Sequence, residues 1–198
     1  MAPVQALPDK SLWVKYSLIA GCDEAGRGPL AGPVVAAAVI LPRHFFHPDI
    51  DDSKKLTAAQ RERLFPKITG AALAYAFGLA DHLVIDECNI LNATKRAMLE
   101  AILALRPKPE AVLIDAIRLD DLKYEQHPII KGDTLSISIA AASILAKVRR
   151  DRIMVDYHRQ YPQYRFDRHK GYPTSLHREM IRKYGPCPIH RKSFKLLP

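Results

Sequence analysis

Four acidic residues stand where they could do chemistry, because each follows an apolar segment closely enough to lie at the edge of a hydrophobic core. Asp23 and Glu24 follow one such run, Asp115 follows a second, and Asp133 comes directly after Gly132 and a shorter third run. An ionised carboxylate beside a core is costly unless it is paired, hydrogen-bonded or bound to a cation. Acids that converge also raise one another's pKa unless a cation neutralises them. The pattern predicts a divalent-metal site, and all-oxygen ligands favour Mg²⁺ or Mn²⁺.

A simpler explanation stays open for individual acids, since an Asp that ends a strand is often a helix cap or a turn former. This alternative holds for Asp133 taken alone and is harder to argue for Asp115, which stands between apolar residues. Asp120 and Asp121 lie in a polar segment, where we expect them to be solvated.

The acidic pair is followed by Gly26, Arg27 and Gly28. Neighbouring side chains of a regular strand point to opposite faces. We therefore expect the strand to end or bulge between Asp23 and Glu24, and the two glycines give the backbone freedom for such a break. The alternative for this triplet is a plain hairpin turn with a solvated arginine.

The elements that must position these residues alternate between strand-like and helix-like patterns, which indicates an α/β domain. Apolar runs predict strands over 18–23, 33–41, 72–79, 111–114 and 128–131. Helical spacing and caps predict helices over 57–68, 90–105, 135–160 and 174–184, with a basic, aromatic-dotted loop over 161–173. We expect one domain, with a core over about 15–154 and a helical, basic appendage over about 155–198.

The positive charge is concentrated near the C-terminus. The formal net charge is +9, and residues 147–198 hold 14 of the 30 Lys and Arg residues but only 4 of the 21 Asp and Glu residues. This is typical of a surface that binds a polyanion, and the alternative is a solvated basic face without a ligand.

Other classes of protein are disfavoured by the sequence. No apolar run approaches the roughly 20 residues that span a bilayer, and the first ten residues do not read as a secretory signal. We expect no membrane association and a cytoplasmic location. The cysteines Cys22, Cys88 and Cys187 are widely spaced, which predicts packing thiols rather than disulfides or a zinc site.

A series of motifs runs in order from about residue 18 to residue 194, beginning with Asp23-Glu24-Ala25-Gly26-Arg27-Gly28. The motifs occupy residues 23–35, 52–56, 85–94, 131–133, 140–148, 150–152, 169–174 and 190–194. In these segments the chain resembles the bacterial type 2 ribonucleases H, the ribonuclease HII family. The resemblance implies an RNase H-like fold, with a mixed central β-sheet flanked by helices and a small helical C-terminal region.

The resemblance also implies an activity: endonucleolytic, metal-dependent hydrolysis of the RNA strand of RNA/DNA hybrids. It further implies cleavage on the 5′ side of single ribonucleotides embedded in duplex DNA, leaving 5′-phosphate and 3′-hydroxyl ends. The catalytic and metal-binding residues would be Asp23, Glu24, Asp115 and Asp133, with Asp23 shared between two Mg²⁺ or Mn²⁺ ions. A binding module without catalysis and a DNA nuclease or recombinase of the same fold superfamily remain as alternatives.

Substrate-binding residues follow from the same resemblance. Gly26, Arg27 and Gly28 would contact the ribose 2′-hydroxyl, the group that distinguishes RNA from DNA. Tyr172 would stack at the junction between the ribonucleotide and the next deoxyribonucleotide, and an ordinary packing tyrosine is the alternative. The basic residues predicted to contact phosphates are Lys54, Lys55, Lys147, Arg150, Arg168, Lys170 and Arg191. The histidines that lack metal-ligand spacing, and are predicted to be polar contacts or phosphate neighbours, are His169, His177 and His190.

Two departures from the family pattern stand out. The chain has Asp115-Ala116 where the family usually has Asp-Gly, so we expect a different local turn. It also stops at Pro198, soon after Phe194, without the extended tail that carries a sliding-clamp contact in some members, and a monomer is expected.

Overall fold

A five-stranded mixed sheet forms the centre of the computed structural model, which describes residues 6–51 and 53–198. Residue 52 of the motif 52–56 and residues 1–5 lie outside the described part. The strands are β1 (Ile19–Ala25), β2 (Val34–Ile40), β3 (Ala74–Ala80), β4 (Ala111–Asp115) and β5 (Glu125–Ile129). Their order is β3-β2-β1-β4-β5, with antiparallel pairing from β3 to β1 and parallel pairing from β1 to β5. The mixed α/β fold expected from the resemblance is confirmed.

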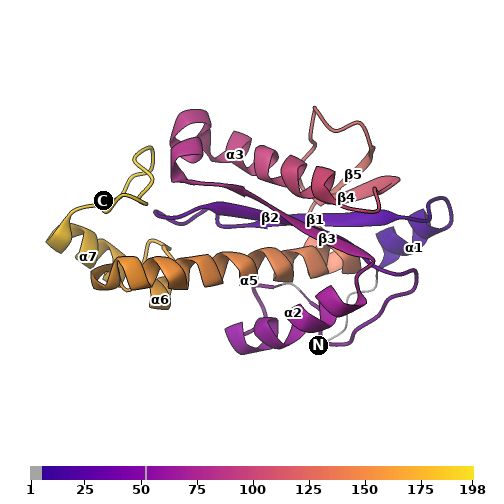
Figure 1. Ribbon diagram of the computed structural model, residues 1–198, viewed down its shortest axis with the longest axis horizontal. Helices are drawn as coiled ribbons and strands as arrows, with labels where there is room; N and C mark the ends of the chain where they lie inside the picture. Colours follow the sequence, from indigo (N-terminus) through magenta and orange to yellow (C-terminus); the bar gives the residue numbers. More distant parts are fainter. Residues whose placement is uncertain (1–5, 52) are drawn as a thin grey trace.

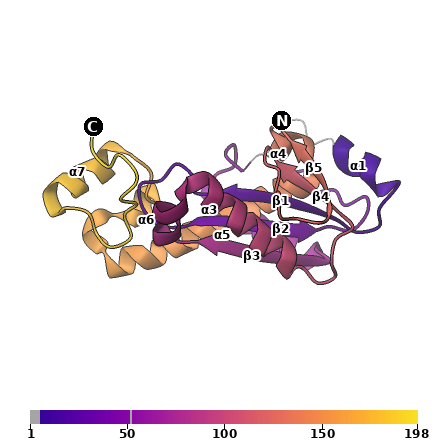
Figure 2. The same cartoon turned by 90° about the horizontal axis from the view of Figure 1, so that it is seen from above.

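Helices cover both faces of this sheet (Figure 1). On one face lies α3 (His82–Ala104), and on the other lie α5 (Ile137–Gln160) and α2 (Ala58–Ala71). The shorter helices are α1 (Leu7–Trp13), α4 (Gly132–Leu135), η1 (Pro162–Tyr164), α6 (Phe166–His169) and α7 (Ser175–Tyr184). Figure 2 shows α6 and α7 beyond one end of the sheet, around the end of α5. Within the described residues, no helix is long and apolar enough to cross a membrane.

The two helical layers lie very close to the sheet. Residues of β1 and β2 alternate between two buried clusters, one beneath α5 and one beneath α3, as period-two strands require. A Cβ on Gly21 of β1 would lie 2.1 Å from the backbone carbon of Ser138 in α5, and a Cβ on Gly78 of β3 would lie 2.0 Å from the Ala97 carbonyl oxygen in α3. Glycine at these two positions is what allows each helix to approach its strand.

The ends of several elements differ from the sequence expectations. The helix predicted over 90–105 is only the second part of α3, which kinks at Asn89, where φ is 67° and the side chain caps the following turn. The helix predicted from 135 begins at Ile137, because Ser136 is extended and caps it, and α4 precedes it. The strand predicted over 128–131 begins at Glu125, in a polar, half-exposed edge strand that carries no apolar signal.

Two further differences concern helices that the sequence patterns did not show. Residues 161–173 were expected to be a loop, but they contain η1 and α6, each of three or four residues. Near the N-terminus, α1 forms without an apolar periodicity, and its buried Asp9 accepts hydrogen bonds from the backbone N–H groups of Ile137 and Ser138. The cysteines are free thiols as expected, with Cys22 and Cys187 buried and Cys88 half-buried.

Ala116 has a φ of 51°, in the left-handed region that favours glycine. This conformation costs an L-residue about 1–2 kcal/mol. We expect Ala116→Gly to raise the free energy of unfolding by up to about 1 kcal/mol, because the relieved strain exceeds the added chain entropy of the unfolded state. Urea denaturation measures it. The control is Ala59→Gly in the first turn of α2, which relieves no strain and should destabilise by up to about 0.5 kcal/mol. A similar loss of stability in Ala116→Gly would contradict backbone strain at Ala116.

Candidate active site

The acids converge because parallel strands end at the same edge of the sheet. The register pairs Cys22 of β1 with Ile114 of β4, so Asp23 and Asp115 are the next residues on adjacent strands. Asp133 arrives on α4, directly after β5. The Asp115 Oδ1 atom accepts a hydrogen bond of 2.7 Å from the Gly132 N–H, which holds α4 against the end of β4.

The expected break between Asp23 and Glu24 is wrong, because β1 continues to Ala25 in regular pairing with β2. Asp23 therefore lies on the α5 side, where the Ser143 hydroxyl favours its ionised form and lowers its pKa, and Glu24 lies on the other face. Both acids still line one pocket, since β4 ends at Asp115 and leaves the edge of β1 open beyond that point.

This pocket has a volume of about 230 Å³ and joins the acids to the residues expected to bind substrate. Its lining residues are Asp23, Glu24, Ala25, Gly26, Arg27, Gly28, Ser53, Lys54, Asp115, Ser143, Lys147 and Tyr172. Asp133 stands beside it, 4% exposed, with its Oδ2 atom 3.3 Å from the Lys54 Nζ atom. The sequence reasoning missed Ser143, whose only signal was its place in a motif of the long helix.

The acids are electrostatically strained where they stand. Burial raises the pKa of Asp23 well above its usual range, and the charges of Glu24 and Asp115 raise it further. Burial also raises the pKa of Glu24, although the Arg27 guanidinium at 3.5 Å partly offsets this. Burial raises the pKa of Asp115 in the same way. A cation bound in the pocket would stabilise the ionised form of these carboxyl groups.

The residues fit a divalent cation by their chemistry. The donor set is all oxygen, and the Glu24 Oε2 atom is buried without a hydrogen-bond partner among the described residues. The acids are not closed into a ligand cluster, however. Within residues 6–51 and 53–198, no three His, Cys, Asp or Glu side chains are close enough together to form a ready metal site. Asp133 is instead turned to Lys54.

Tyr172 stands across the pocket from the Gly26-Arg27-Gly28 loop. It is 37% exposed, and a Cβ on Gly28 would lie 3.8 Å from its Cε1 atom. The Lys147 Nζ atom lies 5.2 Å from the centre of the Tyr172 ring. The tyrosine therefore forms one wall of an open slot and is not enclosed by the core.

The residues predicted to contact phosphates divide into two groups. Arg150 and Arg191 are both 0% exposed, so a direct phosphate contact is wrong for them. Their guanidinium groups donate to backbone carbonyls instead. The residues that remain accessible at least in part are Lys54, Lys55, Lys147, Arg168 and Lys170.

The three predicted histidine contacts form a buried network under the Tyr172 loop. The His169 Nε2 atom bonds the Tyr164 carbonyl, and the His177 Nδ1 atom bonds the Tyr172 carbonyl at 2.9 Å. The His177 and His190 Nε2 atoms lie 3.1 Å apart. The Gly171 N–H donates to the His169 Nδ1 atom and the Cys187 N–H donates to the His190 Nδ1 atom. Each ring therefore has one nitrogen that accepts and one that donates, and all three rings are neutral. The polar-contact role is confirmed, whereas burial rules out contact with phosphates.

Acid should destabilise this network. Burial lowers the pKa of His177 to about 3 and that of His190 to about 4. Unfolded histidines protonate near pH 6.5, so the unfolded chain binds more protons and stability falls as pH drops from about 6.5. The His177→Asn variant keeps a hydrogen-bond donor near the position of Nδ1 but cannot titrate. As pH falls, we expect its free energy of unfolding to decrease by up to about 1.4 kcal/mol less per pH unit than that of the wild type. Urea denaturation at pH 4 to 7 compares both proteins; identical slopes would contradict the neutral network.

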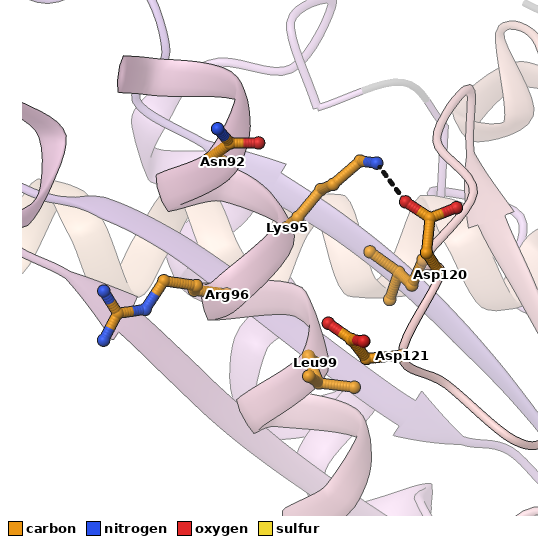
Figure 3. A pocket seen from close by; sticks show the side chains of 7 residues that line it. Asn92, Lys95, Arg96, Leu99, Asp120 and Asp121 are labelled. Carbon is orange, nitrogen blue, oxygen red and sulfur yellow. Dashed lines mark hydrogen bonds and ion pairs between the residues drawn. The ribbon is translucent and has the colours of Figure 1, made fainter. Parts of the chain in front are cut away.

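A second pocket, of about 250 Å³, lies between α3 and the segment before β5 (Figure 3). In this pocket the Lys95 Nζ atom lies 2.8 Å from the Asp120 Oδ2 atom and forms an ion pair with it. Asp120 remains mostly exposed, and Asp121 lies alongside. Charges of both signs balance at this pocket, and it lacks the convergent acids of the first. Asp120 and Asp121 are therefore solvated as expected, and Asp120 also forms an ion pair that the sequence did not predict.

Comparison with known proteins identifies the family of this chain. A family model described as Ribonuclease HII matches residues 20–197. The ribonuclease HII of Ruminiclostridium cellulolyticum is 59% identical over 179 residues, which cover 90% of this chain and 70% of the relative. That of Geobacter metallireducens is 54% identical and covers 94% of this chain and 92% of the relative. The crystal structure of ribonuclease H2 from Pyrococcus horikoshii superposes with a TM-score of 0.74 at 32% identity, covering 90% of this chain and 94% of that one. The chain belongs to the ribonuclease HII family.

Proposed function

We propose that the chain cuts the RNA strand of RNA/DNA hybrids and also cuts on the 5′ side of single ribonucleotides embedded in duplex DNA. Family membership makes it a type 2 endoribonuclease H, a hydrolase that acts within an RNA strand paired to DNA. The observation that carries the finer proposal is the single pocket that joins the acids at the ends of β1 and β4 to the glycine loop and Tyr172.

The acids would hold Mg²⁺ or Mn²⁺, with Asp23, Glu24, Asp115 and Asp133 supplying carboxylate oxygens. Bound there, such ions activate a water molecule and neutralise the charge that develops on the entering and leaving oxygens. The oxygen of a water molecule would bond to phosphorus while that water gives up a proton to solvent, the bond from phosphorus to the 3′ oxygen would break, and the 3′ oxygen would take up a proton from solvent. The products are a 3′-hydroxyl and a 5′-phosphate.

The remaining pocket residues would select and hold the substrate. The Gly26-Arg27-Gly28 loop approaches the ribose without side-chain obstruction, and Tyr172 stacks on the sugar or base of the next nucleotide. Lys54 adds a positive charge for a phosphate, and its side chain is 80% exposed. In this proposal the chain acts as a monomer, and basic residues beyond the core, from about residue 155, help to grip the duplex.

A cleavage assay tests the proposal. A labelled DNA duplex with one ribonucleotide, an RNA/DNA hybrid and an all-DNA duplex are incubated with the protein in Mg²⁺ and in Mn²⁺. We expect cuts in the first two only, with the cut in the first mapping to the 5′ side of the ribonucleotide. Cleavage of the all-DNA duplex would favour a DNA nuclease, and binding without any cut would favour a non-catalytic module.

A further inference from the structure

Arg191 lies completely buried beneath the glycine loop. Its guanidinium donates three hydrogen bonds, all to backbone carbonyls on the two legs of one loop. The acceptors are the carbonyls of Gly26 at 2.7 Å, Arg27 at 3.0 Å and Gly32 at 2.9 Å. A buried cation must be paired, and here carbonyl dipoles take the place of a carboxylate. Burial lowers the pKa of Arg191 to about 9, so it remains charged at neutral pH.

The backbone around Arg191 is fixed to the same loop. Its N–H donates to the Leu30 carbonyl at 2.9 Å, and the Gly32 N–H donates to the Ile189 carbonyl at 2.9 Å. An isolated bridge pairs Ala31 with His190. The segment around residue 190 therefore lines the second leg of the loop, and the Arg191 side chain reaches across to the first leg.

This arrangement determines which way two peptide groups face. In a planar trans peptide, the C=O of one residue and the N–H of the next point in opposite directions. Because Arg191 holds the carbonyls of Gly26 and Arg27, the N–H groups of Arg27 and Gly28 point away from it. Neither N–H donates a hydrogen bond to any described residue, and both residues line the pocket.

We infer that Arg191 is a positioning residue for substrate selection: it holds the glycine loop so that the N–H groups of Arg27 and Gly28 are presented to the ribose 2′-hydroxyl. The inference rests on the proposed function, in which this loop meets the ribose. It assigns Arg191 no contact with the substrate. Its effect passes through the orientation of the two peptide groups.

Arg150 provides a matched control within the same chain. It is also 0% exposed, and its guanidinium also donates to three carbonyls. Those carbonyls belong to Pro33, Lys170 and Ala31, and none belongs to Gly26 or Arg27. Arg150 also borders the slot, since a Cβ on Gly26 would lie 2.1 Å from its Nε atom and its guanidinium lies 5.7 Å from the centre of the Tyr172 ring. A substitution of Arg150 therefore removes the same kind of buried guanidinium beside the same slot but leaves the two peptide groups held by Arg191.

The test compares binding in EDTA of an RNA/DNA hybrid and a DNA duplex of the same sequence, by fluorescence anisotropy. For Arg191→Lys, which keeps the charge but loses the planar fork, we expect hybrid affinity to fall roughly tenfold, the worth of one hydrogen bond, with duplex affinity unchanged. Arg150→Lys leaves the three Arg191 hydrogen bonds in place and should change the ratio much less than Arg191→Lys does, whatever its melting temperature. A folded Arg191→Lys protein with the wild-type ratio, or a wild type without preference for the hybrid, would overturn the inference.

A measurement on the unsubstituted protein covers the case in which Arg191→Lys does not fold. The chain has 9 glycines, so selective ¹⁵N-glycine labelling gives a simple amide spectrum, and Gly28→Ala identifies the Gly28 signal. We expect that signal to shift when the hybrid is added in EDTA and to move much less with the DNA duplex. Equal shifts with both, or none with the hybrid, would refute the inference. Loss of hybrid cleavage by the wild type would instead refute the proposed function.

Discussion

Asp23→Asn is expected to lower hybrid cleavage by roughly 10³-fold or more, while hybrid binding in EDTA remains. The physical reason is that Asn has no negative charge with which to hold the proposed metal ions. Such ions stabilise the transition state by several kcal/mol, and each factor of ten in rate corresponds to about 1.4 kcal/mol. Asn still offers an oxygen to the Glu24 N–H, which donates to Asp23 at 2.7 Å. Single-turnover cleavage in Mg²⁺ and in Mn²⁺ measures the loss, and a rate near that of the wild type would remove Asp23 from the proposed catalytic set.

The same substitution should stabilise the metal-free protein at pH 7. Burial and the neighbouring acids raise the pKa of Asp23, so the folded state binds its proton more tightly than the unfolded state. The metal-free protein therefore loses stability as pH rises above the usual aspartate range, and Asp23→Asn removes that loss. We expect a melting temperature a few degrees higher in EDTA. The control is Asp121→Asn, at an exposed acid of the second pocket, which should change neither cleavage nor stability.

Gly28→Ala is expected to reduce kcat/KM for hybrid cleavage by roughly 10- to 100-fold without unfolding the protein. The new methyl group would meet only the Tyr172 Cε1 atom, at an ordinary contact distance of 3.8 Å. It would nevertheless stand in the slot between the loop and Tyr172, where the ribose is proposed to lie. A misplacement of about 1 Å at a reacting group can cost a hundredfold. Steady-state kinetics and thermal melting together measure the effect.

Two other glycines separate this effect from general damage. Gly26 has a φ of 105°, and a Cβ there would lie 2.1 Å from the Arg150 Nε atom, so Gly26→Ala should destabilise the fold by about 2–4 kcal/mol. Gly70 lies in α2 with nothing within 4 Å of its added Cβ, so Gly70→Ala should keep full activity and gain up to about 1 kcal/mol. If Gly28→Ala kept wild-type kinetics, the ribose would have to bind elsewhere.

Local patterns in the sequence were sufficient to place the acids at the ends of core elements. Apolar runs predicted β1, β2 and β4, and the parallel pairing of β1 with β4 brings Asp23 beside Asp115. The prediction of a break in β1 failed, because pairing with a neighbouring strand, and not the local sequence, determines the conformation of β1 there. β1 stays regular through Glu24, and the short length of β4, rather than a break in β1, opens the site to both faces.

Long-range contacts account for what the sequence could not show. In the sequence Arg191 is one more basic residue of the C-terminal region, and one of its three acceptors, the Gly26 carbonyl, is 165 residues away. Asp9 likewise has no local signal, since its partners lie at the start of α5. The buried histidines were visible as polar residues, but their shared network depends on how residues 164–190 fold back on one another.

The helix α5 connects these separate parts through residues that recur on one of its faces. Ser143 meets Asp23, Lys147 lines the pocket, Arg150 holds loop carbonyls and Met154 packs under Gly32 and Gly171. These positions span about 16 Å of a rod with a rise of 1.5 Å per residue. The rigid helix therefore keeps the cutting site, the ribose slot and the C-terminal basic region at fixed distances from one another. One residue inserted after Ser143 would turn everything beyond it by about 100°, so this helix should tolerate side-chain changes far better than changes of length.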